Sequence, residues 1–472
     1  MDFPVFHLDF LGNRLLIAGI GIVHVFISHG LAVGAMPVIA AMEWWGLRRG
    51  GDGWDRLVYR VLLVCFVITT SVGALTGVGI WFSTSLVNPA AIGSLIRVFF
   101  WAWFSEWVVF TFEVVLIMVY FLTWKRMAER KGLHVGVGAV LAGFSWLTMV
   151  IVTAILAFMM DPGNWLSQRS FLIGFFNPSY LPQLAFRTPL AMIGAATFVL
   201  FLAFFFTRGE PVLRRRAVRW VSTWTLAWTP LAAFAGLWYW RVVPEWAIAN
   251  VPVALTTQQL VAWHRSVAFG LAAVVGLVVA CALVGVLRPA WLPRGALLVP
   301  FLATLVLMGS FERVREFIRK PYVISQYMYA NGLRLEDYPL FAEEGVLAHA
   351  TYAKVREVTA DNRVEAGEEV FRIACSRCHT TSGVNGVVAR LEKLYGRGAW
   401  ERDAVKAYLA SMHNARPFMP PVPGTDAELG ALTDYLLSLQ AWPRPLRGAQ
   451  SVGAGLPAGL DQVAAAAGRS EP

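Results

Sequence analysis

The chain has 472 residues, of which 57% are hydrophobic and only 15% are charged, and its formal net charge at pH 7 is +10. Soluble globular domains carry about 25% charged residues, so this composition excludes an ordinary soluble protein and predicts an integral membrane protein. The predicted fold class is all-α, with a polytopic bundle of about eight transmembrane helices followed by a small helical domain.

Apolar stretches that could cross a bilayer recur along the first two thirds of the chain, each long enough to supply about 20 helical residues. They begin near Leu15, Leu57, Ile96, Gly136, Pro189, Val221, Val261 and Leu297. The first residues lack the basic start and small-residue cleavage site of a signal peptide, so we expect the first helix to be an uncleaved signal anchor.

Basic residues gather in alternate loops between these stretches. They are Arg48, Arg49, Arg56 and Arg60, then Lys125, Arg126, Arg130 and Lys131, then Arg208, Arg214, Arg215, Arg216 and Arg219, and finally Arg288 and Arg294. Loops rich in lysine and arginine stay in the cytoplasm, which predicts a bacterial inner (plasma) membrane protein with both termini on the periplasmic side. These arginines also explain the net charge, so no nucleic-acid partner is expected.

Ionisable residues inside the predicted helices are functional candidates, because burying them in a bilayer is costly. Glu106 and Glu113 are seven residues apart and share one face of the third helix, which predicts a proton pathway. The alternative is a pair of structural carboxyl groups. His24 and His29 lie in the first helix. Their spacing of five does not put them on one face of an α-helix, so at most one would address a given metal.

The end of the eighth helix carries a charged stripe. Glu312, Arg315, Glu316 and Arg319 follow the i, i+3, i+4, i+7 spacing of one helix face. A salt-bridged helix end would explain this stripe. A carboxylate ligand with arginines that hold haem propionates is the functional alternative.

A C-x-x-C-H motif near the end of the chain predicts covalent attachment of one haem c. Cys375 and Cys378 would form the thioether bonds, and His379 would bind the iron from one side. Met419, in Phe418-Met419-Pro420-Pro421, is predicted to be the other axial ligand. This part of the chain resembles a class I cytochrome c. Next to a covalent haem, we interpret His24 as a ligand of a second, buried haem rather than as a structural histidine.

The predicted domain organisation has four parts. Residues 1–319 form the transmembrane domain, 320–361 a polar periplasmic linker with one or two short helices, 362–442 the cytochrome c domain, and 443–472 a disordered tail rich in Gly, Ala, Pro and Ser.

Several stretches together resemble subunit I of the cytochrome bd quinol oxidases. They are Gly21–His24 through Ala41-Met42-Glu43, Gly73–Phe82, Glu106 through Glu113 to Trp124, and Glu316–Tyr322. The resemblance implies that His24 ligates one haem of the family's oxygen-reducing pair and that Glu316 ligates the other, with Arg319 just after Glu316; these buried haems would be of the b and/or d type. It also implies that Glu106, within one residue of alignment, and Glu113 form the proton pathway.

Departures from that family are equally informative. The histidine and methionine that hold the family's low-spin b haem correspond to Arg187 and Ala268, neither of which can ligate iron. The long quinol-binding loop is missing, and the cytochrome c domain replaces the last family helix. Electrons are therefore expected to enter or leave through haem c.

Three functions stay open at this stage. The chain is predicted to be a respiratory electron-transfer haemoprotein, either a cytochrome c-linked terminal oxidase or reductase of another small molecule, or an electron conduit of a larger complex. A scaffold that carries only haem c is the third. Expected partners are the lipid bilayer, a second membrane subunit, and a redox protein and/or quinone. Whether His264 replaces a lost ligand or bonds to a propionate also stays open.

Overall fold

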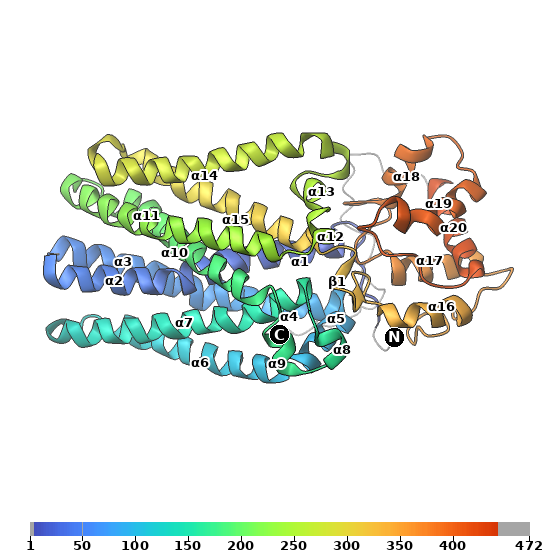
Figure 1. Cartoon of the computed structure of the whole chain (residues 1–472), viewed down its shortest axis with the longest axis horizontal. Helices are drawn as coiled ribbons and strands as arrows, with labels where there is room; N and C mark the ends of the chain where they lie inside the picture. The colour runs from blue at the N-terminus through green and yellow to red at the C-terminus, as the bar shows by residue number, and fades with distance from the viewer. Residues whose placement is uncertain (1–3, 50, 442–472) are drawn as a thin grey trace, which may run out of the picture.

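The computed structural model describes residues 4–49 and 51–441, and almost all regular structure in these ranges is helical. Figure 1 shows an elongated molecule with a bundle of long helices at one end and a group of shorter helices, α17 to α20, at the other. The loops that carry the clustered arginines and lysines lie at the end of the bundle far from α17–α20 (Figure 1). The predicted tail, 443–472, lies outside the described residues.

The bundle follows the predicted order of crossings. Its elements are α1 (Asn13–Val25), η1 (Phe26–Val33), α2 (Ala35–Arg49), α3 (Asp52–Ile68), η2 (Thr69–Gly73), α4 (Ala74–Val87), α5 (Pro89–Val98), α6 (Phe100–Thr123), η3 (Ala128–Arg130), α7 (Lys131–Met160), α8 (Trp165–Gln168), α9 (Phe171–Phe175), α10 (Tyr180–Phe206), α11 (Pro211–Val242), α12 (Glu245–Ile248), α13 (Val251–Leu255), η4 (Gln258–Trp263), α14 (His264–Leu287), η5 (Pro289–Trp291), η6 (Arg294–Leu297) and α15 (Leu298–Ile318).

Seven helical stretches among the described residues are long and apolar enough to cross a membrane, which makes the chain a multi-pass membrane protein in a lipid bilayer. They are Asn13–Arg49, Asp52–Val87, Phe100–Thr123, Ala128–Met160, Tyr180–Phe206, Gln258–Leu287 and Arg294–Ile318. The remaining predicted crossing corresponds to α11, a helix of 32 residues that runs beside the others but is richer in arginine and tryptophan (Figure 1).

Two π-helical segments, η1 and η2, interrupt the first two crossings and pack against each other. A π-helix uses i→i+5 hydrogen bonds, as in the 2.8 Å bond from Gly34 N to His29 O, and such segments are frequent at functional sites. More residues per turn bring His24 and His29 closer to one face than an α-helix would. The sequence pattern did not predict this interruption.

Close backbone approach fixes how η1 meets α10. A Cβ atom at Gly34 would lie 2.1 Å from the carbonyl oxygen of Ala191, so only glycine fits there. Small residues at such crossings let membrane helices pack tightly, since lipid supplies no hydrophobic force between them. At the arginine-rich end, Trp54 of α3 is buried and donates a 2.9 Å hydrogen bond from its indole nitrogen to the carbonyl of Met42 in α2.

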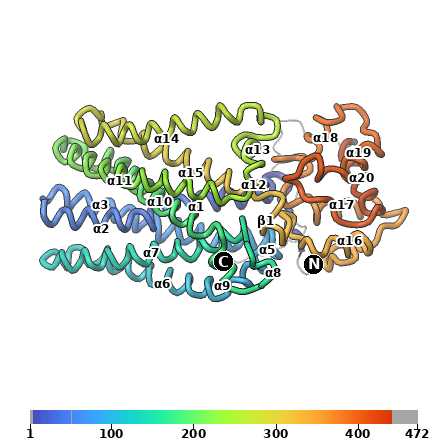
Figure 2. Tube along the Cα trace, viewed as in Figure 1, coloured from blue at the N-terminus to red at the C-terminus, as the bar shows by residue number. Residues whose placement is uncertain are grey.

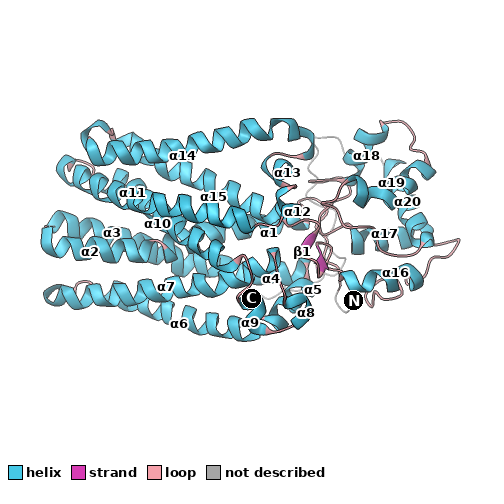
Figure 3. Ribbon diagram, in the orientation of Figure 1, coloured by secondary structure: helices cyan, strands magenta, loops and turns pink. Residues whose placement is uncertain are grey.

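The segment after the bundle contains short helices, as expected, but it begins with a β-hairpin that the sequence did not predict, drawn in magenta in Figure 3. Its strands are antiparallel, and Tyr322 and Tyr329 are partners with rings stacked 5.2 Å apart. The elements of this part of the chain are β1 (Tyr322–Ile324), β2 (Met328–Tyr329), η7 (Leu335–Asp337), α16 (Tyr338–Glu344), α17 (Arg363–Ala374), α18 (Val387–Tyr395), α19 (Arg402–Ala415) and α20 (Asp426–Ala441).

Helices α17 and α20 form the centre of the C-terminal domain. They cross so closely that a Cβ atom at Gly367 would lie 2.0 Å from the carbonyl oxygen of Ala431. Asp434 of α20 joins three helices, because it accepts hydrogen bonds from Arg363 of α17 at 2.7 Å and from Arg402 of α19 at 2.6 Å. The pairing with these guanidinium groups holds the pKa of Asp434 below its ordinary value although burial opposes this.

The N-terminal segment belongs to the outer end of the molecule as well. Figure 2 shows this blue segment running beside the linker and the C-terminal domain. The amide of Val384 donates a 3.1 Å hydrogen bond to the carbonyl of Phe10, and Val5 packs against the core of the C-terminal domain. The two ends of the described chain are therefore held together.

Candidate functional site: a covalent haem motif docked on a polar membrane bundle

The C-x-x-C-H motif begins directly after α17. Neither Cys375 nor Cys378 is in a disulfide, so both are available for thioether formation. The Nδ1 atom of His379 donates a 3.0 Å hydrogen bond to the carbonyl of Asn385, which leaves Nε2 available for iron. Burial lowers the pKa of His379, so the imidazole is neutral near pH 7 and its Nε2 lone pair is free to bind metal.

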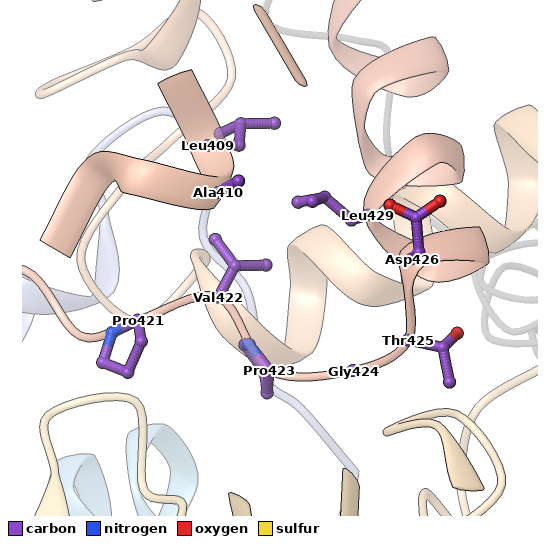
Figure 4. Close-up of a pocket in the computed structure, with 9 residues that line it drawn as sticks. All are labelled: Leu409, Ala410, Pro421, Val422, Pro423, Gly424, Thr425, Asp426 and Leu429. Carbon is purple, nitrogen blue, oxygen red and sulfur yellow. The ribbon is translucent and has the colours of Figure 1, made fainter. Parts of the chain in front are cut away.

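Met419 lies in the loop between α19 and α20. This loop is fixed by hydrogen bonds at both sides of the residue, from Met419 N to Arg416 O at 2.8 Å and from His413 Nδ1 to Met419 O at 2.5 Å. Figure 4 shows the following loop residues, with Val422 directed toward Leu409 and Leu429 and with Asp426 at the rim. They line a hollow of about 260 Å³ beside the methionine loop.

The haem-binding motif faces the membrane bundle rather than open water. Arg377, inside the motif, is 8% exposed and donates hydrogen bonds from Nε to the carbonyl of Val87 at 3.0 Å and from Nη1 to the carbonyl of Asn331. Thr381, just after the motif, donates to Asp9 from its amide at 2.6 Å. The C-terminal domain is thus attached to the end of α4, to the linker and to the N-terminal segment.

His24 lies in α1 against the glycine-rich α4. Its Nδ1 atom is 3.2 Å from Oγ1 of Thr76. The single proton of that hydroxyl is directed at the backbone carbonyls of Val72 and Gly73, so the imidazole is the donor and its Nε2 carries the free lone pair. A Cβ atom at Gly77 would lie 3.2 Å from Cε1 of His24, so the ring packs closely against this glycine. This arrangement fits a metal-ligating histidine.

Glu316 ends α15 at the face of the bundle that meets the C-terminal domain. Its carboxylate pairs with the guanidinium of Arg319 and, at 3.5 Å, with Nζ of Lys320. Its side chain is still 37% exposed, so it is accessible to a ligand. Phe317, the residue after Glu316, packs against Phe418 of the methionine loop, which brings the end of α15 next to the cytochrome c domain. A carboxylate with two adjacent cations fits both parts of the prediction, ligation of iron and binding of propionates.

Arg187 is fully buried and forms what we call the cationic cluster with Glu312, Arg315 and His29. Its Nη2 donates to Glu312 at 3.2 Å, and its Nη1 donates to Nε2 of His29 at 2.7 Å. Arg315 pairs with the other oxygen of Glu312 at 2.8 Å. Because Arg187 occupies the lone pair of His29 Nε2, His29 has no ring nitrogen left for iron on that side.

The two glutamates of α6 differ in burial: Glu113 is buried and Glu106 is half-buried. Glu113 is 9% exposed and accepts hydrogen bonds from Ser145 at 2.7 Å and Thr148 at 3.2 Å, both on α7. We call these three residues the hydroxyl site. Glu106 is half-buried two turns away, about 10 Å along the helix. In the described part of the chain, no cation pairs with Glu113.

A third polar group in the bundle was missed by the sequence analysis. Glu43 of α2 accepts hydrogen bonds from Tyr120 at 2.6 Å and from Nδ1 of His134 at 2.7 Å. All three residues are almost completely buried. His134 follows a cluster of basic loop residues. Its position near the end of the expected helix gave no sign that its side chain is buried. The group ties α2, α6 and α7 together at the arginine-rich end.

His264 begins α14 and donates a 2.7 Å hydrogen bond from Nδ1 to the carbonyl of Val261. Ala268, one turn further, is exposed on the outer side of the same helix.

Comparison with known proteins bears on both parts of the chain. Residues 362–436 match the family described as "Cytochrome C oxidase, cbb3-type, subunit III". The structure is also similar to that of a bd oxidase from Geobacillus thermodenitrificans, with a TM-score of 0.57 and 17% sequence identity over 68% of this chain and 90% of that chain. The chain has a bd-oxidase-like fold and ends in a cytochrome c domain. No curated protein matches its sequence.

These similarities confirm the resemblance expected from the sequence and the all-helical fold class. They support a membrane haemoprotein that works in electron transfer and carries haem c. The residues around His24 and Glu316 fit a further haem, and the cationic cluster stands where a low-spin haem ligand was expected to be lost.

Proposed function

We propose that the chain transfers electrons between haem c and one or more non-covalent haems of the b and/or d type held near His24 and Glu316. The observation that carries this proposal is the position of the cytochrome c motif against the membrane bundle, where Arg377, inside the motif, donates a 3.0 Å hydrogen bond to the carbonyl of Val87 at the end of α4. Haem supplies a reversible one-electron couple at each site when it is bound.

The protein residues have separate roles in this proposal. His24, with its ring oriented by Thr76, would hold one haem through Nε2, and Glu316 would supply the carboxylate ligand of another. Arg319 and Lys320 neutralise carboxylates at the rim. Cys375, Cys378, His379 and Met419 hold haem c. Arg187 and its ion pairs fill the region of the lost low-spin haem, which favours electron entry through haem c rather than from quinol.

A second candidate function is reduction of oxygen or another small molecule at the buried haem. The hydroxyl site favours it, because a carboxyl group bonded only to hydroxyls in a membrane interior can take up and release protons. Glu106 would continue this pathway. An electron conduit would have no use for such a site, and a scaffold with haem c alone would use neither His24 nor Glu316.

The position of the molecule in the cell follows from the same proposal. We assign the cytochrome c domain and the N-terminus to the periplasmic side of a bacterial inner membrane and the arginine-rich loops to the cytoplasm. We keep the boundaries 1–319, 320–361 and 362–442 for the three parts. Rows of exposed aromatic side chains on α6, among them Trp101 and Trp107, favour a second membrane subunit at that face. An external redox protein and/or quinone would exchange electrons with the assembly.

The test is a carbon monoxide difference spectrum of the dithionite-reduced protein, combined with extraction of non-covalent haem. A response from extractable haem supports an open iron and small-molecule reduction, whereas extractable haem without a response supports an electron conduit. His24→Ala and Glu316→Gln should each lower the extractable haem while covalent haem c is kept. Glu129→Gln, at an exposed loop position, is the matched control. Wild-type protein without extractable haem would refute the proposal.

A further inference from the structure

Two phenylalanine rings meet where the cytochrome c domain touches the membrane bundle. Phe317 directly follows Glu316 in α15, and Phe418 directly precedes Met419 in the methionine loop. Their ring centroids are 5.6 Å apart with an interplanar angle of 46°. Rings at this separation are in van der Waals contact. Each ring is thus one peptide unit from a residue that we assign as an iron ligand.

Several contacts keep this pair in a fixed position. The guanidinium of Arg14 lies 5.2 Å from the centre of the Phe317 ring. On the other side, the hydrogen bonds of Met419 N to Arg416 O and of His413 to Met419 O fix the loop that carries Phe418. Arg416 also contacts Gln258 of η4 in the bundle. The contact is therefore supported by both parts of the molecule.

The two rings connect Glu316 with Met419 through two peptide units and one van der Waals contact. Electron tunnelling through protein is faster through bonded and packed atoms than across gaps. The docking contacts of Arg377 and Thr381 hold the haem c motif against the same face of the bundle. Another aromatic contact at this face joins Tyr329 and His413, with ring centroids 6.4 Å apart. Tyr329 is neither an assigned iron ligand nor next to one in the sequence, so this contact does not lead directly to the buried haem.

We propose that the Phe317–Phe418 contact is the route by which electrons pass between haem c and the haem held near Glu316. This inference rests on the proposed function. In each transfer the ferrous iron of haem c loses one electron and becomes ferric, while the ferric iron of the non-covalent haem gains it and becomes ferrous. No bond is formed or broken, and no proton moves between the rings.

The experiment uses the full chain in detergent. Haem c is reduced rapidly by ascorbate with a redox mediator, and the subsequent reduction of the non-covalent haem is followed by absorbance. We expect Phe317→Leu and Phe418→Leu each to slow this second step several-fold, and Phe418→Tyr to keep nearly the wild-type rate. Phe311→Leu is the matched control, because Phe311 is also on α15 but packs on Phe186 within the bundle.

Two further readouts separate a lost route from a damaged site. The midpoint potentials of both haems and the methionine–iron charge-transfer band of haem c should be the same in the leucine variants as in the wild type. Wild-type transfer rates in both leucine variants, with both haems present, would overturn the proposed route while leaving the proposed function intact. Wild-type protein that lacks non-covalent haem would overturn both.

Discussion

The cationic cluster and the hydroxyl site are both buried in the membrane bundle, but their carboxyl groups have different partners. Glu312 is held between two guanidinium groups, from Arg187 and Arg315. Glu113 is held by two hydroxyl groups. A carboxylate between fixed cations stays charged and stabilises helix packing, whereas one bonded to hydroxyls can change its protonation. The difference separates a structural polar site from one suited to proton transfer.

The largest effect is expected from breaking the cationic cluster. Arg187→Met leaves Glu312 with one cation and His29 without its donor, so the free energy of unfolding should fall by about 3 kcal/mol. Thermal unfolding in detergent, followed by tryptophan fluorescence, measures it. Arg265→Met changes an exposed arginine of α14 and should shift stability by less than about 0.5 kcal/mol. Equal stability of the two variants would show that the cationic cluster does not stabilise the fold.

The second effect concerns chemistry at the hydroxyl site. If the protein reduces oxygen, Glu113→Gln should lower turnover about 100-fold, since loss of a proton-transfer group has effects of this order. Oxygen uptake with ascorbate and a mediator measures turnover. Electron transfer from haem c in a single turnover should keep its rate. Glu129→Gln, in an exposed loop position, is the control. Unchanged turnover would show that Glu113 is structural too.

A smaller effect is expected from the hydroxyl that is closest to Glu113. Ser145→Ala removes the 2.7 Å hydrogen bond, which is worth about 1 kcal/mol, so turnover should fall about fivefold. Thr148→Val removes the 3.2 Å bond and should cost less. The ratio of the two effects, measured by oxygen uptake, tests whether the hydroxyls tune the carboxyl. A larger loss from the threonine variant would contradict the order of their distances.

The smallest effect comes from a carboxylate outside the membrane, which serves as a reference for both sites. The hydrogen bond from His7, together with those from Thr381, lowers the pKa of Asp9 from 3.8 to about 2. A lowered pKa stabilises the folded form above pH 3.8, and this stabilisation is lost as the pH falls toward 2. As the pH falls from 3.8 toward 2, the Thr381 amide should therefore lose its protection against hydrogen exchange. Asp9→Asn should abolish this pH dependence, and an unchanged profile in that variant would exclude Asp9 as its source.

Residue patterns predicted the crossings and the haem c motif well, because hydropathy and a short covalent motif are local properties. The starts near Leu57, Val261 and Leu297 fall inside or at observed helices. The π-helical segments were not predictable, since their residues are as apolar as those of an α-helix. The hairpin at Tyr322 was missed because its strands are only three and two residues long.

The sequence could name candidate side chains but could not pair them. Arg187 was recognised as unable to bind iron, yet its bonds to His29 and Glu312 join residues separated by 158 and 125 positions. Likewise, Phe317 and Phe418 are ordinary apolar residues until the domains are docked. Glu43 and His134 were not selected because no local pattern shows that they meet.

The docking of Arg377 has a consequence for how the protein is made. Arg377 is buried where the cytochrome c domain meets the end of α4. Covalent attachment of haem at Cys375 and Cys378 requires access to this stretch. We therefore expect attachment to precede docking, with the loaded domain closing onto the bundle afterwards.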